Sequence, residues 1–304
     1  MKARGKEHVF LLHLLAISST LVVRSPPSSF GQAPETPVFH QDVAWSPEGA
    51  RLAFSARHNG SWHVYVADLA TGEVRPLTSG ASQDTWTTWS PDGLQVAFSS
   101  SVSGQPADPF VTSIAASGVT TRLTTQQGDR SSQPAWSPDG RRIAFVAKRG
   151  AAHQQIWLMN RDGSAPQPLT ALAMDAESPQ WSRDGSRLVF YSDAGNRRDQ
   201  IWTIHADGHG LTAVTHDTAN NIYPSWTPDG ELVWSQQVGG DTRLVHARAD
   251  GSNAAPLVSQ AAFFARVSPD GKSIALIVGH YPSTTLTVCD LRGEHCRAIN
   301  PPPA

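Results

Sequence analysis

The stretch Trp136-Ser137-Pro138-Asp139-Gly140 recurs along the chain and decides its fold. Related stretches begin at Trp45, Trp89, Trp181, Trp226 and Val267, so successive copies are separated by 44, 47, 45, 45 and 41 residues. Self-similarity at a period of about 40–50 residues is typical of repeat architectures, in which each copy is one supersecondary unit. Six such units fill residues 39–300.

Each unit predicts four short strands. Ser-Pro-Asp-Gly suits a type I turn that joins the first strand to the second. The second strands read large-small-large, as in Ile143-Ala144-Phe145, so both faces of each sheet should be buried. Four-stranded sheets that are buried on two faces and repeat around a ring are propeller blades. We therefore expect an all-β fold, a six-bladed β-propeller of four-stranded antiparallel blades, in which large residues of one blade meet small residues of the next.

One segment disagrees locally with this prediction. Ala254–Arg266 has a composition that favours a helix, but the repeat places the end of one blade and the first strand of the next there. Because the period is supported on both sides of the segment, we expect strands.

The repeat resembles a known family at these residues. The Trp-Ser-Pro-Asp-Gly motif, a following Ile-Ala-Phe strand, an Ile-Trp strand such as Ile156-Trp157, an Asp-Gly turn and a closing Leu-Thr are similar to the WD40-like (PD40) repeat of TolB-type propellers. Tricorn-type and dipeptidyl-peptidase-type proteases carry similar propeller domains. The resemblance implies the fold over about 260 residues, but one propeller scaffold supports many functions. TolB itself has an additional N-terminal domain, which we do not find ahead of the first unit here.

The N-terminus predicts export. Lys2, Arg4 and Lys6 precede an apolar run over residues 9–23, and small residues before Ala33 suit cleavage after it. We expect a signal peptide over residues 1–33, a linker over 34–38, the propeller over 39–300 and a tail over 301–304. An uncleaved N-terminal anchor is the alternative. The predicted location is the periplasm or the outside of the cell, with no transmembrane span in the mature chain.

Composition and motifs argue against several functional classes. The chain has 24 Lys and Arg against 26 Asp and Glu, so no basic excess indicates nucleic-acid binding. The sequence lacks a Gly-x-Ser-x-Gly elbow, a His-Glu-x-x-His helix, a phosphate-binding Gly-Lys loop and EF-hand spacing. The Asp of each Ser-Pro-Asp-Gly turn is expected to be structural. We expect no catalytic residues, no cofactor, no metal and a monomeric chain.

Candidate binding residues follow from propeller geometry. The position three residues before each repeat Trp should lie near the mouth of the central channel. It varies in residue type where structural positions would repeat one type, and it holds Asp42, Trp86, Gln133, Ser178, Tyr223 and Phe264. Loops at the same end of the ring add a basic fringe of Arg57, His58, Arg149 and Arg198. Aromatic residues and Arg are enriched in protein interfaces, although aromatic residues that only fill the channel would give the same pattern.

The chain contains two cysteines, Cys289 and Cys296. If Arg292-Gly293 forms a two-residue hairpin loop, the two cysteines oppose each other across the hairpin. We therefore predict a disulfide, which an oxidising compartment would permit; two free buried thiols are the alternative. Because each unit is complete in itself, closure of the ring should depend on packing between the first and last blades and on the disulfide. Pairing of an N-terminal strand into the last blade, as in many propellers, is the alternative.

Three hypotheses for function follow. The first is an exported, non-catalytic propeller that binds a protein or peptide of the cell envelope. The second is an enzyme or carbohydrate-binding protein with a site in the central channel, because some similar propellers are lyases of pectin fragments. The third is a structural module whose catalytic partner is another chain. Charged residues that converge on the channel would favour the second, and aromatic and neutral polar residues the first.

Overall fold

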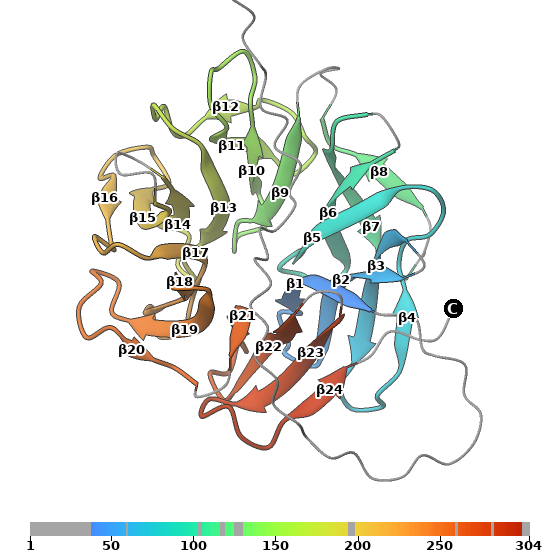
Figure 1. Cartoon of the computed structure of the whole chain (residues 1–304). Helices are drawn as coiled ribbons and strands as arrows, with labels where there is room; N and C mark the ends of the chain where they lie inside the picture. The colour runs from blue at the N-terminus through green and yellow to red at the C-terminus, as the bar shows by residue number, and fades with distance from the viewer. Residues whose placement is uncertain are drawn as a thin grey trace, which may run out of the picture. The chain divides into compact units, whose positions relative to one another are not determined.

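The computed structural model describes residues 38–58, 60–102, 105–115, 119–124, 130–193, 198–258, 261–280 and 283–299. These residues form 24 strands in six four-stranded antiparallel sheets, which confirms the predicted six-bladed propeller (Figure 1). The predicted leader over residues 1–33 and the tail over 301–304 lie outside the described residues. In the part of the chain that is described, no helix is long and apolar enough to cross a membrane.

Each blade is one contiguous repeat whose strands follow in chain order from the channel outward (Figure 1). Blades 1 to 3 comprise β1 (Phe39–Trp45), β2 (Arg51–His58), β3 (Ser61–Asp68) and β4 (Val74–Pro76); β5 (Gln83–Trp89), β6 (Gln95–Ser101), β7 (Asp108–Ser113) and β8 (Thr120–Arg122); and β9 (Ser131–Trp136), β10 (Arg142–Ala147), β11 (Gln155–Asn160) and β12 (Gln167–Pro168). Blades 4 to 6 comprise β13 (Ala176–Trp181), β14 (Arg187–Ser192), β15 (Gln200–His205) and β16 (Thr212–Ala213); β17 (Asn220–Trp226), β18 (Leu232–Val238), β19 (Asp241–Ala247) and β20 (Ala255–Pro256); and β21 (Ala262–Val267), β22 (Ser273–His280), β23 (Ser283–Asp290) and β24 (Arg297–Ile299).

The period therefore overrides the local helix propensity of Ala254–Arg266, which forms β20 and most of β21. Because the strands alternate in direction, the ring has two distinct ends. We call the end with the loops between second and third strands, and with the links between blades, the channel-mouth rim. The opposite end, with the Ser-Pro-Asp-Gly turns and the turns between third and fourth strands, is the turn rim.

The hydrophobic core lies between the blades. Its buried residues fall into clusters that each join two neighbouring blades. Ala53 of blade 1 packs with Trp89 and Phe98 of blade 2, and Ala97 of blade 2 packs with Phe145 of blade 3. The predicted meeting of large and small residues across blades is thus confirmed, and it buries both kinds of side chain.

The Ser-Pro-Asp-Gly turn has a structural role. In blade 2, Ser90 Oγ donates to Asp92 Oδ1 at 2.6 Å, and the Gly93 amide donates to the Ser90 carbonyl at 2.9 Å. The same Ser–Asp hydrogen bond recurs in blades 3, 4 and 6. These hydroxyl bonds hold the pKa of each Asp below its usual range, and that of Asp184 falls to about 2. The recurring Asp therefore stabilises its own turn.

The ring closes through contacts between blades 1 and 6. The His40 amide donates to Thr284 Oγ1 at 2.6 Å, and the Thr284 amide donates to the Val38 carbonyl at 3.0 Å. Trp45 Nε1 donates to the Arg266 carbonyl at 2.8 Å. All four strands of blade 6 come from the last repeat, so no strand is exchanged between blades 1 and 6 within the described residues.

Cys289 and Cys296 form a disulfide within blade 6. The register between β23 and β24 pairs Val288 with Arg297, which places the two cysteines opposite each other. The bond therefore links neighbouring strands of one blade and does not link blade 6 to blade 1.

Candidate functional site at the central channel

A β-bulge interrupts the innermost strand of blades 2 to 6. The register between first and second strands shifts at the position three residues before the repeat Trp. At this position the backbone takes a left-handed φ of 50–65°, which is strained for residues other than glycine, in Trp86 (62°), Gln133 (53°), Ser178 (56°), Tyr223 (55°) and Phe264 (55°). Blade 1 differs, because its register shift lies between His40 and Asp42. The variable position found in the sequence is thus a repeated backbone feature.

Hydrogen bonds from the preceding blade hold four of these five bulges, those at Trp86, Gln133, Ser178 and Phe264. The carboxylate of Asp42 accepts the amides of Trp86 at 2.7 Å and Thr87 at 2.9 Å, and it also accepts the Thr87 hydroxyl at 2.7 Å. Ser55 donates its hydroxyl to the same carboxylate. Asp42 is fully buried, so its carboxylate connects two blades and does not face the channel-mouth rim.

Other residue types perform the same task in later blades. Ser99 Oγ accepts the amide of Gln133 at 2.8 Å, and Gln133 Oε1 in turn accepts the amide of Ser178 at 2.5 Å. Ser235 Oγ accepts the amide of Phe264 at 3.0 Å. Gln133, Ser178 and Phe264 are each no more than 6% exposed, so their side chains offer little surface to a partner.

Three aromatic rings meet across the channel. The ring centroids of Trp86 and Tyr223 are 5.8 Å apart, those of Tyr223 and Phe264 5.3 Å, and those of Trp86 and Phe264 6.1 Å. These residues come from blades 2, 5 and 6, so the two contacts of Trp86 join blades that are not neighbours in the ring, whereas Tyr223 and Phe264 lie on adjacent blades. We call them the channel aromatic cluster. Phe264 is buried, whereas Trp86 and Tyr223 are half-buried and can present part of their rings to a ligand.

A cationic side chain lies beside this cluster. The guanidinium carbon of Arg266 is 4.3 Å from the centroid of the Phe264 ring, a cation–π distance. Burial lowers the pKa of Arg266 to about 10, and the nearby Asp42 carboxylate opposes that shift. Arg266 therefore balances the charge of Asp42 at the joint between blades 6 and 1.

Carboxylates gather on the other side of the channel. Tyr191 Oη donates to Glu177 Oε2 at 2.7 Å, and the Tyr191 ring meets the Tyr223 ring edge-on at a centroid distance of 5.8 Å. Burial raises the pKa of Glu177, and the Asp175 carboxylate adds to the rise. Burial, together with Glu177 and Asp193, raises the pKa of Asp199 to about 6. A carboxyl group with a pKa near neutrality exchanges protons easily at physiological pH.

The basic residues predicted for the fringe lie around the channel-mouth rim. Arg57 and His58 end β2, Arg149 follows β10 and Arg198 precedes β15. Arg57 and Arg198 are exposed, while Arg149 is half-buried over the rings of Phe145 and Trp157 at 5.3 and 5.2 Å. The fringe is thus spread over several blades and does not converge on one point.

Comparison with known proteins places the chain in a family. Residues 32–198 and 175–301 match the TolB β-propeller domain. The chain belongs to the TolB β-propeller family. A putative TolB from Agrobacterium tumefaciens is a similar solved structure, with 23% identity, a TM-score of 0.66 and coverage of 79% of this chain and 89% of that one. TolB from Acinetobacter baumannii shares 17% identity with a TM-score of 0.69 over 83% of this chain, which spans 63% of that protein.

Other members of this fold have different activities. An oligogalacturonate lyase in complex with manganese shares 14% identity, with a TM-score of 0.61 over 90% of this chain and 84% of the lyase. No curated protein sequence matches the chain. At these identities the solved structures establish the fold of this TolB-family propeller alone.

Sequence reasoning missed Glu177, Tyr191, Asp199 and Arg266. Comparison of equivalent positions within the repeat carries a signal for two of them. Arg266 occupies the position before the repeat Trp or Val, where the other copies carry Ala, Thr, Ala, Gln and Ser. Tyr191 stands where the others have Ser, Ser, Val, Ser and Ile. Glu177 lies next to the link that enters blade 4, and Asp199 lies next to the loop before β15. Only folding brings both carboxyl groups close to Tyr191 and Tyr223.

Proposed function

We propose that this TolB-family propeller is an exported, non-catalytic module that binds a protein or peptide of the cell envelope at its channel-mouth rim. The observation that carries the proposal is the half-buried aromatic pair Trp86 and Tyr223, which lies within a rim bearing the exposed Arg57 and Arg198. Aromatic and Arg side chains around a partly enclosed site are the residues that dominate the energy of protein interfaces. Export through residues 1–33 is part of the proposal.

Site-specific crosslinking tests where a partner binds. A photo-crosslinking residue placed at position 198 on the channel-mouth rim should capture a defined envelope protein, and one placed at position 183 on the turn rim should not. Both positions are exposed, so a difference in capture reflects where the partner binds and not how accessible each position is. Equal capture at the two positions would contradict the proposed site.

Truncation of the aromatic pair then tests the residues. With a captured partner in hand, Trp86→Ala and Tyr223→Ala should each weaken binding by about 1–3 kcal/mol, as at an interface hot spot. Because both rings also pack against the core, the affinities should be measured on variants whose circular dichroism matches the wild type. Phe264→Ala is the matched control, since the same cluster contains this ring but buries it completely.

A second function is favoured by one observation. Glu177 and Asp199 place carboxyl groups with raised pKa values beside the channel, and such groups are suited to acid–base chemistry on a ligand in the channel. The alternative is therefore a carbohydrate-binding protein or a lyase-like enzyme. Incubation with oligogalacturonides, followed by absorbance of unsaturated products, tests it. Product formed by the wild type and lost in Glu177→Gln would favour this alternative over the binding module.

A further inference from the structure

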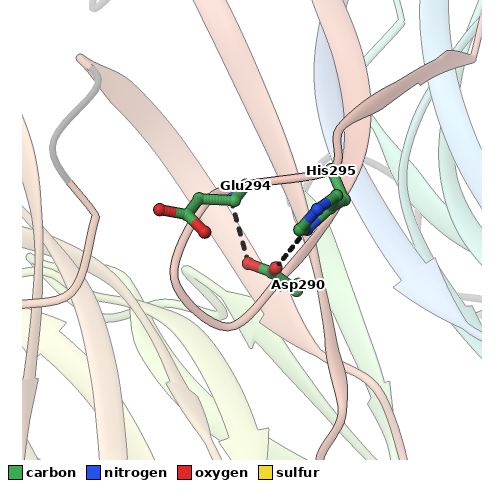
Figure 2. A group of neighbouring side chains, drawn as sticks. All are labelled: Asp290, Glu294 and His295. Atoms are coloured by element: carbon green, nitrogen blue, oxygen red, sulfur yellow. Dashed lines mark hydrogen bonds and ion pairs between the residues drawn. The ribbon is translucent and has the colours of Figure 1, made fainter.

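The turn between β23 and β24 on the turn rim brings three potential metal ligands together. Asp290, Glu294 and His295 each offer one ligand atom, and these atoms all lie within 4.8 Å of one another (Figure 2). Asp290 Oδ2 is 2.9 Å from His295 Nδ1. We expected no metal because the sequence lacks a His-Glu-x-x-His helix and EF-hand spacing, but a turn can bring together ligands that follow no such motif.

The turn is held in shape by bonds on both sides of these residues. Asp290 Oδ1 accepts the amides of Arg292 and Glu294, each at 2.9 Å. The disulfide joins Cys289 to Cys296, the residues that directly flank the segment. The backbone of residues 290–295 is therefore fixed before any ligand arrives, so binding does not have to order it.

The equivalent turns of other blades show that this geometry does not require these side chains. Blades 3 and 5 carry Asn160, Ser164 and Ala165, and Arg248, Ser252 and Asn253, at the three positions. Ala165, Asn253 and His295 share a left-handed φ of 50°, 59° and 51°. The same backbone thus forms with neutral or non-ligating residues. The equivalent turns of blades 1 and 4 carry two potential ligands each, Asp68 and Glu73 or His205 and His209, so among these five turns only that of blade 6 has three.

We propose that Asp290, Glu294 and His295 form a site for a borderline divalent transition ion, of which Zn²⁺ is the representative. An imidazole nitrogen and two carboxylates suit such an ion, whereas Ca²⁺ and Mg²⁺ prefer oxygen ligands alone. His295 Nδ1 and Asp290 Oδ2 are hydrogen-bonded at 2.9 Å. Two tetrahedral ligands at about 2.0–2.2 Å from one ion lie about 3.3–3.6 Å apart, so the pair has to open by a few tenths of an ångström to hold the ion. The ion takes the place of the proton between His295 Nδ1 and Asp290 Oδ2. A doubly protonated His295 then releases one proton as the ion binds, whereas a neutral His295 binds the ion as its Nε2–H tautomer with no net release.

Zinc titration of the chain tests the site. The protein must carry no histidine tag and must have its disulfide intact, because free thiolates at positions 289 and 296 would bind zinc themselves. Calorimetry with ZnCl₂ near neutral pH should show one site per chain. His295→Gln and Glu294→Gln should each weaken binding by about tenfold or more, and Asp290→Asn should do the same while keeping an oxygen for the turn amides.

His246→Gln is the matched control. His246 Nε2 lies 2.5 Å from Glu231 Oε2, so it forms a His–carboxylate pair without the second carboxylate. This variant should bind zinc as the wild type does. The proposal fails if the wild type takes up no zinc, if His295→Gln binds it equally well, or if Ca²⁺ competes with zinc on equal terms.

Discussion

The buried carboxylate of Asp42 in blade 1 accepts the backbone amide of Trp86 in blade 2 at 2.7 Å. A residue that the sequence placed at a binding surface is therefore the acceptor that holds the bulge of the next blade. Trp86 itself reaches the channel because this bond fixes its left-handed backbone. This position is thus structural in blade 1, and a binding role of Trp86 in blade 2 is part of the proposed function.

Removal of the Asp42 carboxylate should destabilise the fold. Asp42→Ala leaves two amides and two hydroxyls without their acceptor and leaves Arg266 without its counter-charge. The expected loss in the free energy of unfolding is about 3 kcal/mol or more, measured by urea denaturation. Asp42→Asn, which keeps one acceptor oxygen, should lose less. A loss below about 1 kcal/mol for the alanine variant would contradict this role.

Acid should loosen the joint between blades 1 and 6 through His40. Its Nδ1 lies 3.0 Å from the Thr284 carbonyl, its Nε2 has no hydrogen-bond partner among the described residues, and burial lowers its pKa to about 4. The unfolded chain takes up this proton near pH 6.5, whereas the folded chain does so near pH 4, so stability falls as the pH drops through that window.

The size of this effect follows from the two pKa values. Relative to His40→Gln, which cannot titrate here, the wild type should lose about 3 kcal/mol between pH 7 and pH 4. Urea denaturation of both proteins across this range measures the difference. The other titrating groups contribute equally to the pH dependence of both proteins, so their contributions cancel. A constant difference would show that His40 does not couple to folding.

The fold could be predicted from the sequence, but the burial and the contacts of the candidate site residues could not. Six Trp-Ser-Pro-Asp-Gly copies specify six blades because each copy carries its own turn chemistry and its own pair of buried faces. The burial of Asp42, Gln133 and Ser178 was not predictable, because it depends on which side chain of the preceding blade reaches each bulge amide. The meeting of Trp86, Tyr223 and Phe264 depends on contacts across the axis, which a repeat pattern does not encode.

Asp199 should lower the free energy of unfolding at neutral pH. Its pKa of about 6 lies above that of the unfolded chain, so the folded state binds more protons between about pH 4 and 6 and gains stability as the pH falls. Asp199→Asn should therefore stabilise the protein by about 1–2 kcal/mol at pH 7, with the gain disappearing near pH 4. Thermal unfolding of both proteins at the two pH values measures it. An unchanged or lower stability at pH 7 would contradict the raised pKa.

Loss of the disulfide should affect blade 6 alone. The bond closes a short loop, because the two cysteines are 7 residues apart, so its removal in the Cys289→Ser, Cys296→Ser double variant should cost about 2 kcal/mol. Hydrogen exchange should increase in β23 and β24 and remain unchanged at the His40–Thr284 contact. Faster exchange at that contact would show that the bond supports ring closure.

The closure of the ring without strand exchange has a consequence for how the chain can be rearranged. The joint between blades 6 and 1 is held by packing and hydrogen bonds, as are the other five, and the start of β1 and the end of β24 both lie on the channel-mouth rim. A gene that joins the end of β24 to the start of β1 and opens the chain in any other link between blades should therefore encode the same propeller. In such a circular permutant each blade remains one uninterrupted segment, so no blade has to be completed from distant parts of the chain.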